Sequence, residues 1–330
     1  MLQSRLLAPV LLTIASIASS GACVGARYIT AAPLARPANQ ALPVAVSPNV
    51  VVVSIDGLRP DAIGSFPAPT LQRLIREGSY TLSATTILPS KTLPSHSSML
   101  TGQPPERHGV LWNTVFTSRS REVELPTVFG LARAAGYHTA AFFSKPKFQA
   151  LQREGTLDYT QAPGGLSGGW SSRRTVNDVA RYLETHRPNL LFVHLADPDR
   201  AGHRDGWMSA AYGEAVTSAD MALGRLIELG ERTYGAGRFT LIVTADHGGH
   251  EFDHGSDDPR DMTIPWIAWG HAVKGGLLPP AQVIETMDTA STILWLLGVD
   301  RPADWAGEPV EAAFETKPAD ARVADAARVH

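Results

Sequence analysis

The sequence predicts an α/β protein in which a mostly parallel central sheet is covered by helices on both faces. Two observations support this fold class. Short runs of β-branched and other apolar residues alternate along the chain with longer segments of helical spacing. The first run, residues 49–55 (NVVVVSI), is a continuous run of mainly apolar β-branched residues, as expected for a strand buried on both faces of a parallel sheet.

The individual elements follow from these patterns in chain order. Strands are predicted at residues 49–55, 139–144, 189–195, 239–245 and 263–270. Helices are predicted at residues 70–78, 125–136, 172–187, 207–230 and 285–298, the second of them ending at Gly136. Residues 88–96 lead into a short apolar run that can start a further helix. After Trp305 the chain is rich in alanine and charge, which predicts a loose helix or disorder.

Composition excludes several classes of protein. Of 330 residues, 44% are hydrophobic and 18% charged, so the chain is globular, and 29 Lys and Arg against 32 Asp and Glu give a net charge of −3. Without a basic stretch to neutralise phosphates, a nucleic-acid scaffold is not expected. The single cysteine, Cys23, excludes a disulfide framework and a cysteine-based zinc site. Any metal site must therefore be built from histidine and carboxylate side chains.

The N-terminal segment predicts export. Residues 1–23 combine Arg5, a short apolar run and small residues before Cys23, the pattern of a signal peptide. The run is shorter than the roughly 20 residues that span a bilayer. Its end resembles a lipoprotein signal with Cys23 as the lipidated residue, and plain secretion is the alternative. We expect a periplasmic or cell-surface protein with an Ala/Pro-rich tether at 24–48, a catalytic domain at 49–306 and a tail at 307–330.

Polar residues follow several predicted strands directly. Asp56 ends the first strand, Asp199 and His203 follow the strand at 189–195, and Asp246 and His247 end the strand at 239–245. In open α/β sheets such strand ends converge on the ligand-binding crevice. Taken singly, a strand-end Asp is often a helix N-cap, and a lone Asp-His pair is more often a surface feature than a ligand pair.

Their combination predicts a centre for two metal ions. Asp199 and His203 are four residues apart and share one face of a helical turn, and His254 follows His247 closely enough to reach the same crevice. Carboxylate and imidazole ligands without thiolate suit zinc, with manganese as second choice. Two neighbouring ions suit phosphoryl chemistry with a hydroxyl nucleophile at a helix N-terminus, for which Thr92 fits and Ser90 and Ser95 are rivals.

The motifs resemble those of the type I phosphodiesterase and nucleotide pyrophosphatase family of the alkaline phosphatase superfamily. Residues 91–96 (KTLPSH) with 101–109 (TGQPPERHG) resemble the nucleophile segment, and residues 198–203 (PDRAGH) resemble a ligand motif. The resemblance covers about residues 50–298. It implies an alkaline phosphatase-like fold and Thr92 as nucleophile. For the ligands of the first zinc it implies Asp199, His203 and His254, and for the second Asp56, Asp246 and His247 joined by the Thr92 oxygen.

The resemblance also assigns residues around the substrate, and the sequence departs from it. Asn113 matches a residue that hydrogen-bonds a phosphoryl oxygen, and Lys91 is either a phosphate contact or a surface lysine. Only six residues separate His247 from His254, where family members insert a long segment, so a single domain without a large cap is expected. His250 is an alternative to His254, which is favoured by the Gly-Ser-Asp sequence that follows it. Asp197 is an extra acid, interpreted as support for a zinc-bound histidine.

These residues predict a metal-dependent hydrolase of small phosphate esters. Phosphodiester hydrolysis through a phospho-Thr92 intermediate with two zinc ions is the favoured activity. A phosphomonoesterase or phosphonate hydrolase is the nearest alternative. A sulfatase ranks lower because Thr92 cannot become formylglycine and because His96 stands where sulfatases have arginine. A lipid-anchored binding protein without turnover ranks last.

Overall fold

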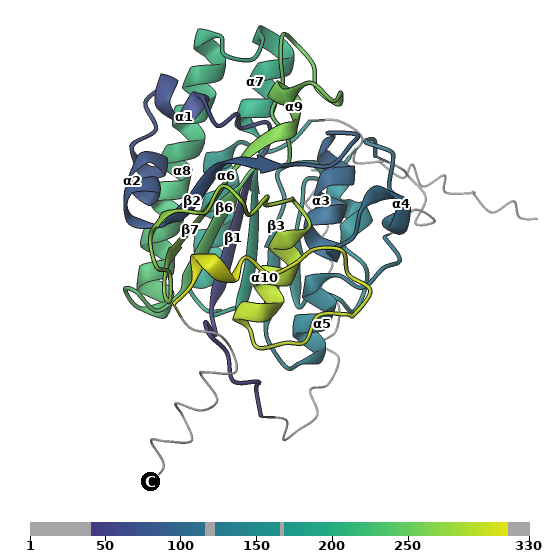
Figure 1. Ribbon diagram of the computed structural model, residues 1–330, viewed down its shortest axis with the longest axis vertical. Coiled ribbons are helices and arrows are strands. Elements are labelled where there is room, and N and C mark those ends of the chain that lie inside the picture. The colour runs from purple at the N-terminus through teal and green to yellow at the C-terminus, as the bar shows by residue number, and fades with distance from the viewer. Residues whose placement is uncertain (1–40, 116–122, 166–167, 316–330) are drawn as a thin grey trace, which may run out of the picture.

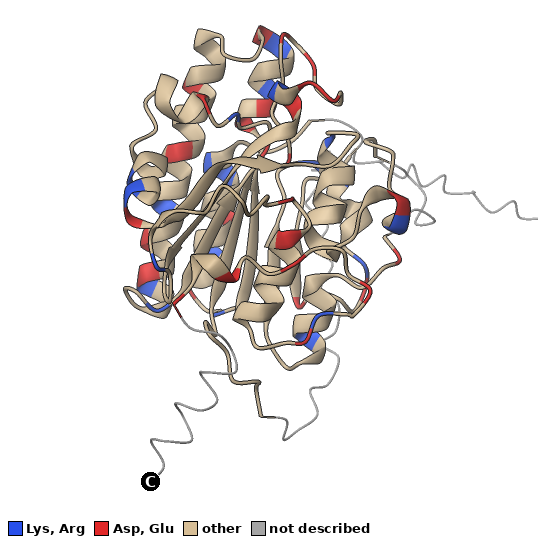
Figure 2. Ribbon diagram, viewed as in Figure 1, with Lys and Arg blue, Asp and Glu red and all other residues tan. Residues whose placement is uncertain are grey.

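The computed structural model describes residues 41–115, 123–165 and 168–315. The predicted signal peptide with Cys23, and the predicted tether up to residue 40, lie outside the described residues. Within the described ranges, no helix is both long enough and apolar enough to cross a membrane. Figure 2 shows acidic and basic residues interspersed over the helices in this view.

One eight-stranded sheet forms the centre of the molecule, in the order β4-β3-β5-β1-β6-β7-β2-β8 (Figure 1). Strands β4, β3, β5, β1 and β6 run parallel to one another, whereas β7 is antiparallel to both β6 and β2. The strand bounds are β1 Val50–Ile55, β2 Ser79–Thr85, β3 Thr139–Phe142, β4 Tyr159–Gln161, β5 Leu190–Leu195, β6 Thr240–Thr244, β7 Thr263–Gly270 and β8 Gly276–Leu277. The predicted mostly parallel sheet is confirmed.

Helices cover both faces of this sheet, as predicted (Figure 1). One face carries α1 Ala62–Ser65, α2 Pro69–Glu77, α6 Ser172–Leu183 and α8 Ala210–Tyr234. The other carries α3 Thr92–Thr101, α4 Pro105–His108, α5 Val128–Ala134 and α10 Asp288–Leu296. The short helix α7 Asp197–Asp205 follows β5, and the short helix α9 Pro259–Met262 precedes β7. The 3-10 helices are Pro146–Leu151 and Glu311–Ala313.

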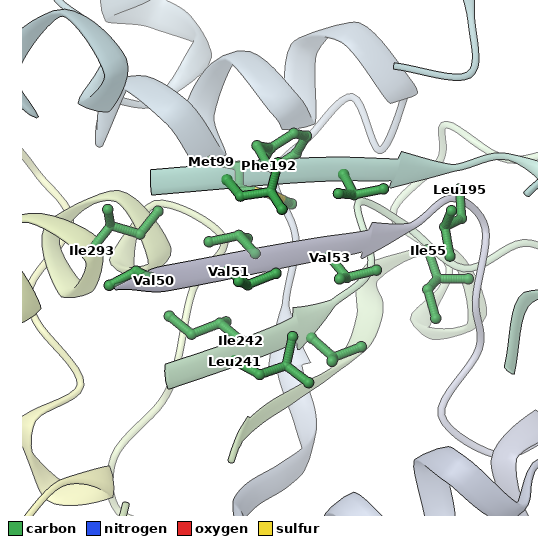
Figure 3. Packing of buried hydrophobic residues seen from close by; sticks show 14 of the residues in the cluster. Val50, Val51, Val53, Ile55, Met99, Phe192, Leu195, Leu241, Ile242 and Ile293 are labelled. Atoms are coloured by element: carbon green, nitrogen blue, oxygen red, sulfur yellow. The ribbon is translucent and has the colours of Figure 1, made fainter. Parts of the chain in front are cut away.

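The core is built around β1, one of the two central strands of the sheet. All six of its residues are buried, and in Figure 3 its valines lie between Phe192 of β5 and Leu241 of β6. Met99 of α3 and Ile293 of α10 belong to the same buried cluster. Full burial of each such side chain contributes about 1.5–3 kcal/mol relative to exposure. The ends of β1, β5 and β6 are thus held at fixed relative positions.

Three strands of the sheet were not predicted from the sequence. β2 has a mixed burial pattern with an irregularity between Thr81 and Ala84, and β4 and β8 are only three and two residues long. Their sequences carry little apolar alternation, so pairing with neighbours, rather than local propensity, determines that they form strands. The predicted helix at 207–230 begins later, with Ser209 as its N-cap, and continues to Tyr234 before Gly235.

The C-terminal part of the described chain packs on the core. Val310, Ala313 and Phe314 are buried, and Trp305 lies so close to Gly102 that a Cβ at position 102 would be 2.3 Å from its ring. Gly102 has a φ of 63°, the left-handed conformation that ends α3. The predicted tail at 307–330 therefore begins with residues that belong to the packed domain, and residues 316–330 lie outside the described chain.

His108 makes the stability of the fold depend on pH. Its Nδ1 accepts the Val110 N–H at 3.1 Å, and its Nε2 lies 2.9 Å from Ser98 Oγ, an arrangement that requires the neutral ring. Burial lowers the pKa of His108 to about 4. Because the unfolded chain binds this proton near pH 6.5, the stabilisation is present above that pH and is lost as the pH falls through about 4.

We therefore expect the free energy of unfolding to rise more steeply with pH in the wild type than in His108→Gln. Between pH 5 and pH 6 the difference in slope approaches that of one proton, about 1.4 kcal/mol per pH unit. Urea unfolding of both proteins across this range measures it. Parallel curves for the two proteins would show that His108 has no such effect.

Candidate functional site

The ends of the central strands bring the predicted carboxylates together. Asp56 follows β1, and its backbone oxygen accepts the Asp199 N–H at 3.0 Å, which fixes the start of α7 against the end of β1. A Cβ at Gly57, where φ is 71°, would lie 3.0 Å from Asp199 Cα, so glycine permits this approach. Asp246 accepts the Gly57 N–H at 3.2 Å, which joins the end of β6 to the same place.

One group of ligand atoms consists of Asp199, His203 and His254. Asp199 Oδ1 lies 3.4 Å from the Nε2 atoms of both histidines, and these two nitrogens are 3.1 Å apart. The His254 side chain is buried, whereas the His203 side chain is 42% exposed, so this group lies at the opening of the site. Asp199 and His203, four residues apart on α7, lie on the same side of the helix, as predicted from the sequence.

A second group consists of Asp56, Asp246 and His247, all fully buried. His247 Nε2 lies 3.3 Å from Asp56 Oδ1 and 3.2 Å from Asp246 Oδ2. It also lies 3.8 Å from Asp199 Oδ1, so the two groups adjoin. The structure thus brings together all six side chains that the sequence singled out as ligands.

Backbone carbonyls orient the three ligand histidines. The Nδ1 atom of His203 lies 2.9 Å from Phe252 O, that of His247 lies 2.8 Å from Gly248 O, and that of His254 lies 2.7 Å from Ser90 O. A carbonyl only accepts, so each Nδ1 carries a proton, and in the neutral ring each Nε2 presents a lone pair to the site. This is the tautomer in which a histidine binds a metal through Nε2.

In this arrangement, carboxylate oxygens face the Nε2 atoms of the ligand histidines. Within the described residues, three buried carboxylate oxygens have no hydrogen-bond partner: Asp56 Oδ1, Asp199 Oδ1 and Asp246 Oδ2. Each lies 3.2–3.4 Å from a histidine Nε2 that presents its own lone pair. Buried acceptors at this distance repel one another unless a cation lies between them. The nitrogen and oxygen ligands fit zinc, and the same set accepts manganese.

The carboxylates differ in their electrostatic surroundings. Burial raises the pKa of Asp56, but the Lys145 ammonium and the His194 hydrogen bond outweigh it and hold that pKa well below the ordinary value. Burial and then the charge of Asp56 hold the pKa of Asp246 well above its ordinary value. A bound cation would remove the cost of ionising Asp246 in this crowded anionic cluster.

Thr92 is the first residue of α3 and is fully buried. Its Oγ1 lies 3.4 Å from His247 Nε2, and the predicted N-terminal position on the helix is confirmed. The rival hydroxyls are engaged elsewhere. Ser90 Oγ donates to Ser256 O at 2.8 Å, and Ser95 Oγ donates to Asp246 O at 2.7 Å. Thr92 is therefore the hydroxyl that contacts the ligand groups.

Asn113, from the segment after α4, contacts the start of α3 next to Thr92. Its Oδ1 accepts the Leu93 N–H at 3.0 Å and the Lys147 ammonium at 3.0 Å. Both partners are pure donors, so the contacted atom is the oxygen, and the amide nitrogen faces away from them. Asn113 thus presents N–H groups next to the N-terminus of α3.

Two lysines that sequence analysis missed lie at this site. Lys145 Nζ lies 2.6 Å from Asp56 Oδ2, 2.5 Å from Asp199 Oδ2 and 3.5 Å from Thr92 Oγ1. Burial, and then the charge of Lys145, lower the pKa of Lys147 to about 8, so its ammonium stays largely charged at pH 7. Both follow β3, a predicted strand, so the strand-end rule that indicates the carboxylates applies to this position as well.

Three further residues do not join the ligand groups. Lys91 is the residue before α3, and its side chain packs against Gly255. The interpretation of Asp197 as a support for a ligand histidine is wrong, because it accepts the Ser172 N–H at 3.0 Å at the start of α6. His250 Nδ1 lies 2.7 Å from Asp261 Oδ1, so the alternative ligand is tied to a different carboxylate.

Comparison with solved structures identifies the fold. The murine ectonucleotide pyrophosphatase / phosphodiesterase 5, in a structure of an inactive threonine-to-alanine variant with AMP, has a TM-score of 0.66 at 18% identity, over 77% of this chain and 96% of that one. The alkaline phosphatase PafA has a TM-score of 0.63 at 12% identity, over 82% of this chain and 99% of that one. The fold is therefore alkaline phosphatase-like, as predicted.

The family follows from the sequence comparisons. The model of the type I phosphodiesterase / nucleotide pyrophosphatase family matches residues 50–283. The chain belongs to this family. Mouse ectonucleotide pyrophosphatase/phosphodiesterase family member 3 is 25% identical over 221 residues, which are 61% of this chain and 25% of the relative. The chain thus spans about a quarter of that relative's length.

Proposed function

We propose that this chain hydrolyses phosphate esters, phosphodiesters among them, with Thr92 as nucleophile and two zinc ions at the two ligand groups. The observation that carries the proposal is the position of Thr92 Oγ1, buried at the N-terminus of α3 and 3.4 Å from His247 Nε2. Family membership supports it. So does the murine relative, which is described as inactive when a threonine is replaced by alanine and which holds AMP.

The ligand groups fit the proposed ions. Asp199, His203 and His254 would hold one, and Asp56, Asp246 and His247 the other, because their ligand atoms lie within one ion's reach of one another. Bound zinc would lower the pKa of a neighbouring hydroxyl and stabilise negative charge on the leaving oxygen. Manganese, which accepts the same nitrogen and oxygen ligands, remains the second choice.

The reaction consists of two displacements at phosphorus. Thr92 Oγ forms a bond to phosphorus while the bond to the leaving oxygen breaks, and the leaving group departs with that electron pair and takes up a proton. Water then attacks the phospho-threonine, restores the Thr92 hydroxyl and releases the phosphate product. Asn113 donates N–H groups to a non-bridging oxygen, and the N-terminus of α3 favours the negative charge there.

We also propose that the enzyme acts outside the cytoplasm on small phosphate esters. The signal peptide pattern at residues 1–23 supports export, and lipidation of Cys23 stays a prediction. Only six residues separate His247 from His254, so no long inserted segment covers the site there. This arrangement supports access for varied leaving groups.

A substrate panel on the zinc-loaded protein tests the proposed function. We expect hydrolysis of 4-nitrophenyl phosphate or bis(4-nitrophenyl) phosphate. We expect 4-nitrophenyl sulfate to be turned over at least about 10²-fold more slowly, because a site built for one polar group rejects an analogue that does not match it. A chelator should remove activity, and added zinc should restore it. Preferential hydrolysis of the sulfate, or no ester hydrolysis by protein with two bound zinc ions, contradicts the proposal.

A further inference from the structure

Two cationic side chains lie beside the nucleophile without being ligands. Lys145 Nζ is 3.5 Å from Thr92 Oγ1, and its side chain is only 10% exposed. Lys147, two residues further along, reaches Asn113 Oδ1 at 3.0 Å. Lys145 directly precedes the 3-10 helix Pro146–Leu151, and Lys147 is the second residue of that helix, so its start brings both ammonium groups to the N-terminal end of α3.

Lys147 also fixes the direction in which Asn113 donates. The Asn113 oxygen is held between the Lys147 ammonium and the Leu93 N–H. The amide nitrogen therefore points away from both, and its N–H groups are aimed without reorganisation at the moment of reaction. Lys147 thus places a positive charge beside the Asn113 amide and helps to fix the orientation of that amide.

A charge count shows what these lysines add. In the two ligand groups, Asp56, Asp199 and Asp246, with a Thr92 alkoxide, carry four negative charges, which two divalent ions would balance. The Asp253 carboxylate also lies near His203 and His254, but it is exposed, so solvent screens its charge. Lys145 and Lys147 then supply two positive charges in excess. A phosphate monoester dianion carries two negative charges on three non-bridging oxygens, whereas a diester carries one on two. The excess matches the monoester.

We propose that Lys145 and Lys147 recognise the additional charged oxygen of a phosphate monoester, so that this site takes phosphate monoesters in preference to diesters. The inference rests on the proposed function and narrows its substrate class. In a diester, a neutral ester oxygen and its organic group stand where the monoester has a charged oxygen. The two ammonium groups then lose a charge-assisted partner and remain partly desolvated.

The first test compares two substrates with the same leaving group. On zinc-loaded wild type we expect kcat/KM for 4-nitrophenyl phosphate to exceed that for bis(4-nitrophenyl) phosphate by at least about tenfold, as one charge-assisted contact allows. Lys147→Met should lower kcat/KM for the monoester by about 10- to 100-fold and that for the diester by less than about threefold, because the Leu93 N–H still holds Asn113 Oδ1. Lys147→Arg should retain most of the monoester preference.

A second readout does not depend on turnover. Calorimetric titration of the zinc-loaded protein with inorganic phosphate should show about 10- to 100-fold weaker binding in Lys147→Met, with zinc content unchanged near two per chain. Lys274→Met, which removes the same charge from an exposed lysine after β7, should match the wild type in phosphate binding and substrate preference.

The outcomes separate this inference from the proposed function. A wild type that prefers the diester, or a Lys147→Met variant that loses both activities equally and binds phosphate normally, overturns the monoester preference. In both cases hydrolysis that still requires Thr92 leaves the proposed function intact. Full activity without the Thr92 hydroxyl would instead overturn the proposed function. If Lys147→Met fails to fold, the wild-type ratio and Lys147→Arg still decide.

Discussion

Thr92→Ala is expected to lower kcat/KM for every phosphate ester by at least about 10³-fold, while zinc content stays near two per chain. The variant removes only the Oγ1 and methyl atoms. Of the six ligand side chains, His247 is the one that contacts Oγ1, and Gly248 O still holds its Nδ1. His96 Nδ1 contacts the backbone oxygen of Thr92, at 2.7 Å, so the local packing of α3 is preserved. Activity, metal analysis and thermal unfolding of the same preparation measure the three quantities.

Two variants sharpen this result. Thr92→Ser keeps a hydroxyl at the same place and should retain measurable turnover. Ser90→Ala removes a hydroxyl that already donates to Ser256 O, and it should stay within about tenfold of the wild type, the scale of a single neutral hydrogen bond. Acid-quenched protein should carry phosphate on Thr92 in mass spectra. Phosphate on Ser90, or full turnover by Thr92→Ala, would show that another group is the nucleophile.

The ligand cluster could be predicted because strand ends are readable. The continuous apolar runs of β1, β5 and β6 mark where these strands stop, and parallel strands bring the residues that follow to one edge of the sheet. Asp56 and Asp246 needed only this rule. The i, i+4 spacing of Asp199 and His203 then placed His203 on the same side, as α7 confirms.

The same rule indicates the turn that carries the lysines, because it follows a predicted strand, but it does not show which way their side chains point. Their charges lie in a turn whose path depends on the Pro146–Leu151 helix packing against α3, and no local pattern predicts that packing. From the sequence, Lys91, which adjoins Thr92, is either a phosphate contact or a surface lysine. The ammonium within 3.5 Å of Thr92 Oγ1 in the described chain belongs to Lys145, 53 residues away.

The edge of the sheet was unpredictable for a different reason. β2 is not a strongly apolar segment, and it becomes a strand because β7 pairs with it antiparallel over most of its length. Residues 307–315 appeared to be a tail by composition, yet Val310 and Phe314 fill space beside the core. In both places a contact with distant residues outweighs local preference.

His254→Ala is expected to lose one zinc ion per chain, whereas His250→Ala keeps two. His254 Nε2 lies 3.4 Å from Asp199 Oδ1 and 3.1 Å from His203 Nε2, so its removal leaves that group with two ligands. His250 instead contacts Asp261, which accepts the Gly255 and Ser256 N–H groups at 3.1 Å and so supports the turn after His254. We expect hydrolysis to fall at least about 10³-fold in the first variant and about 10- to 100-fold in the second.

Metal analysis after equilibrium dialysis against limiting zinc distinguishes a ligand from its support. A lost ligand lowers the stoichiometry even at saturating zinc, whereas a lost support weakens affinity and is rescued by more zinc. His250→Ala should therefore regain most of its activity as the zinc concentration rises, and His254→Ala should not. The opposite pattern would assign the third ligand to His250, which would then have to leave Asp261 and turn toward His203.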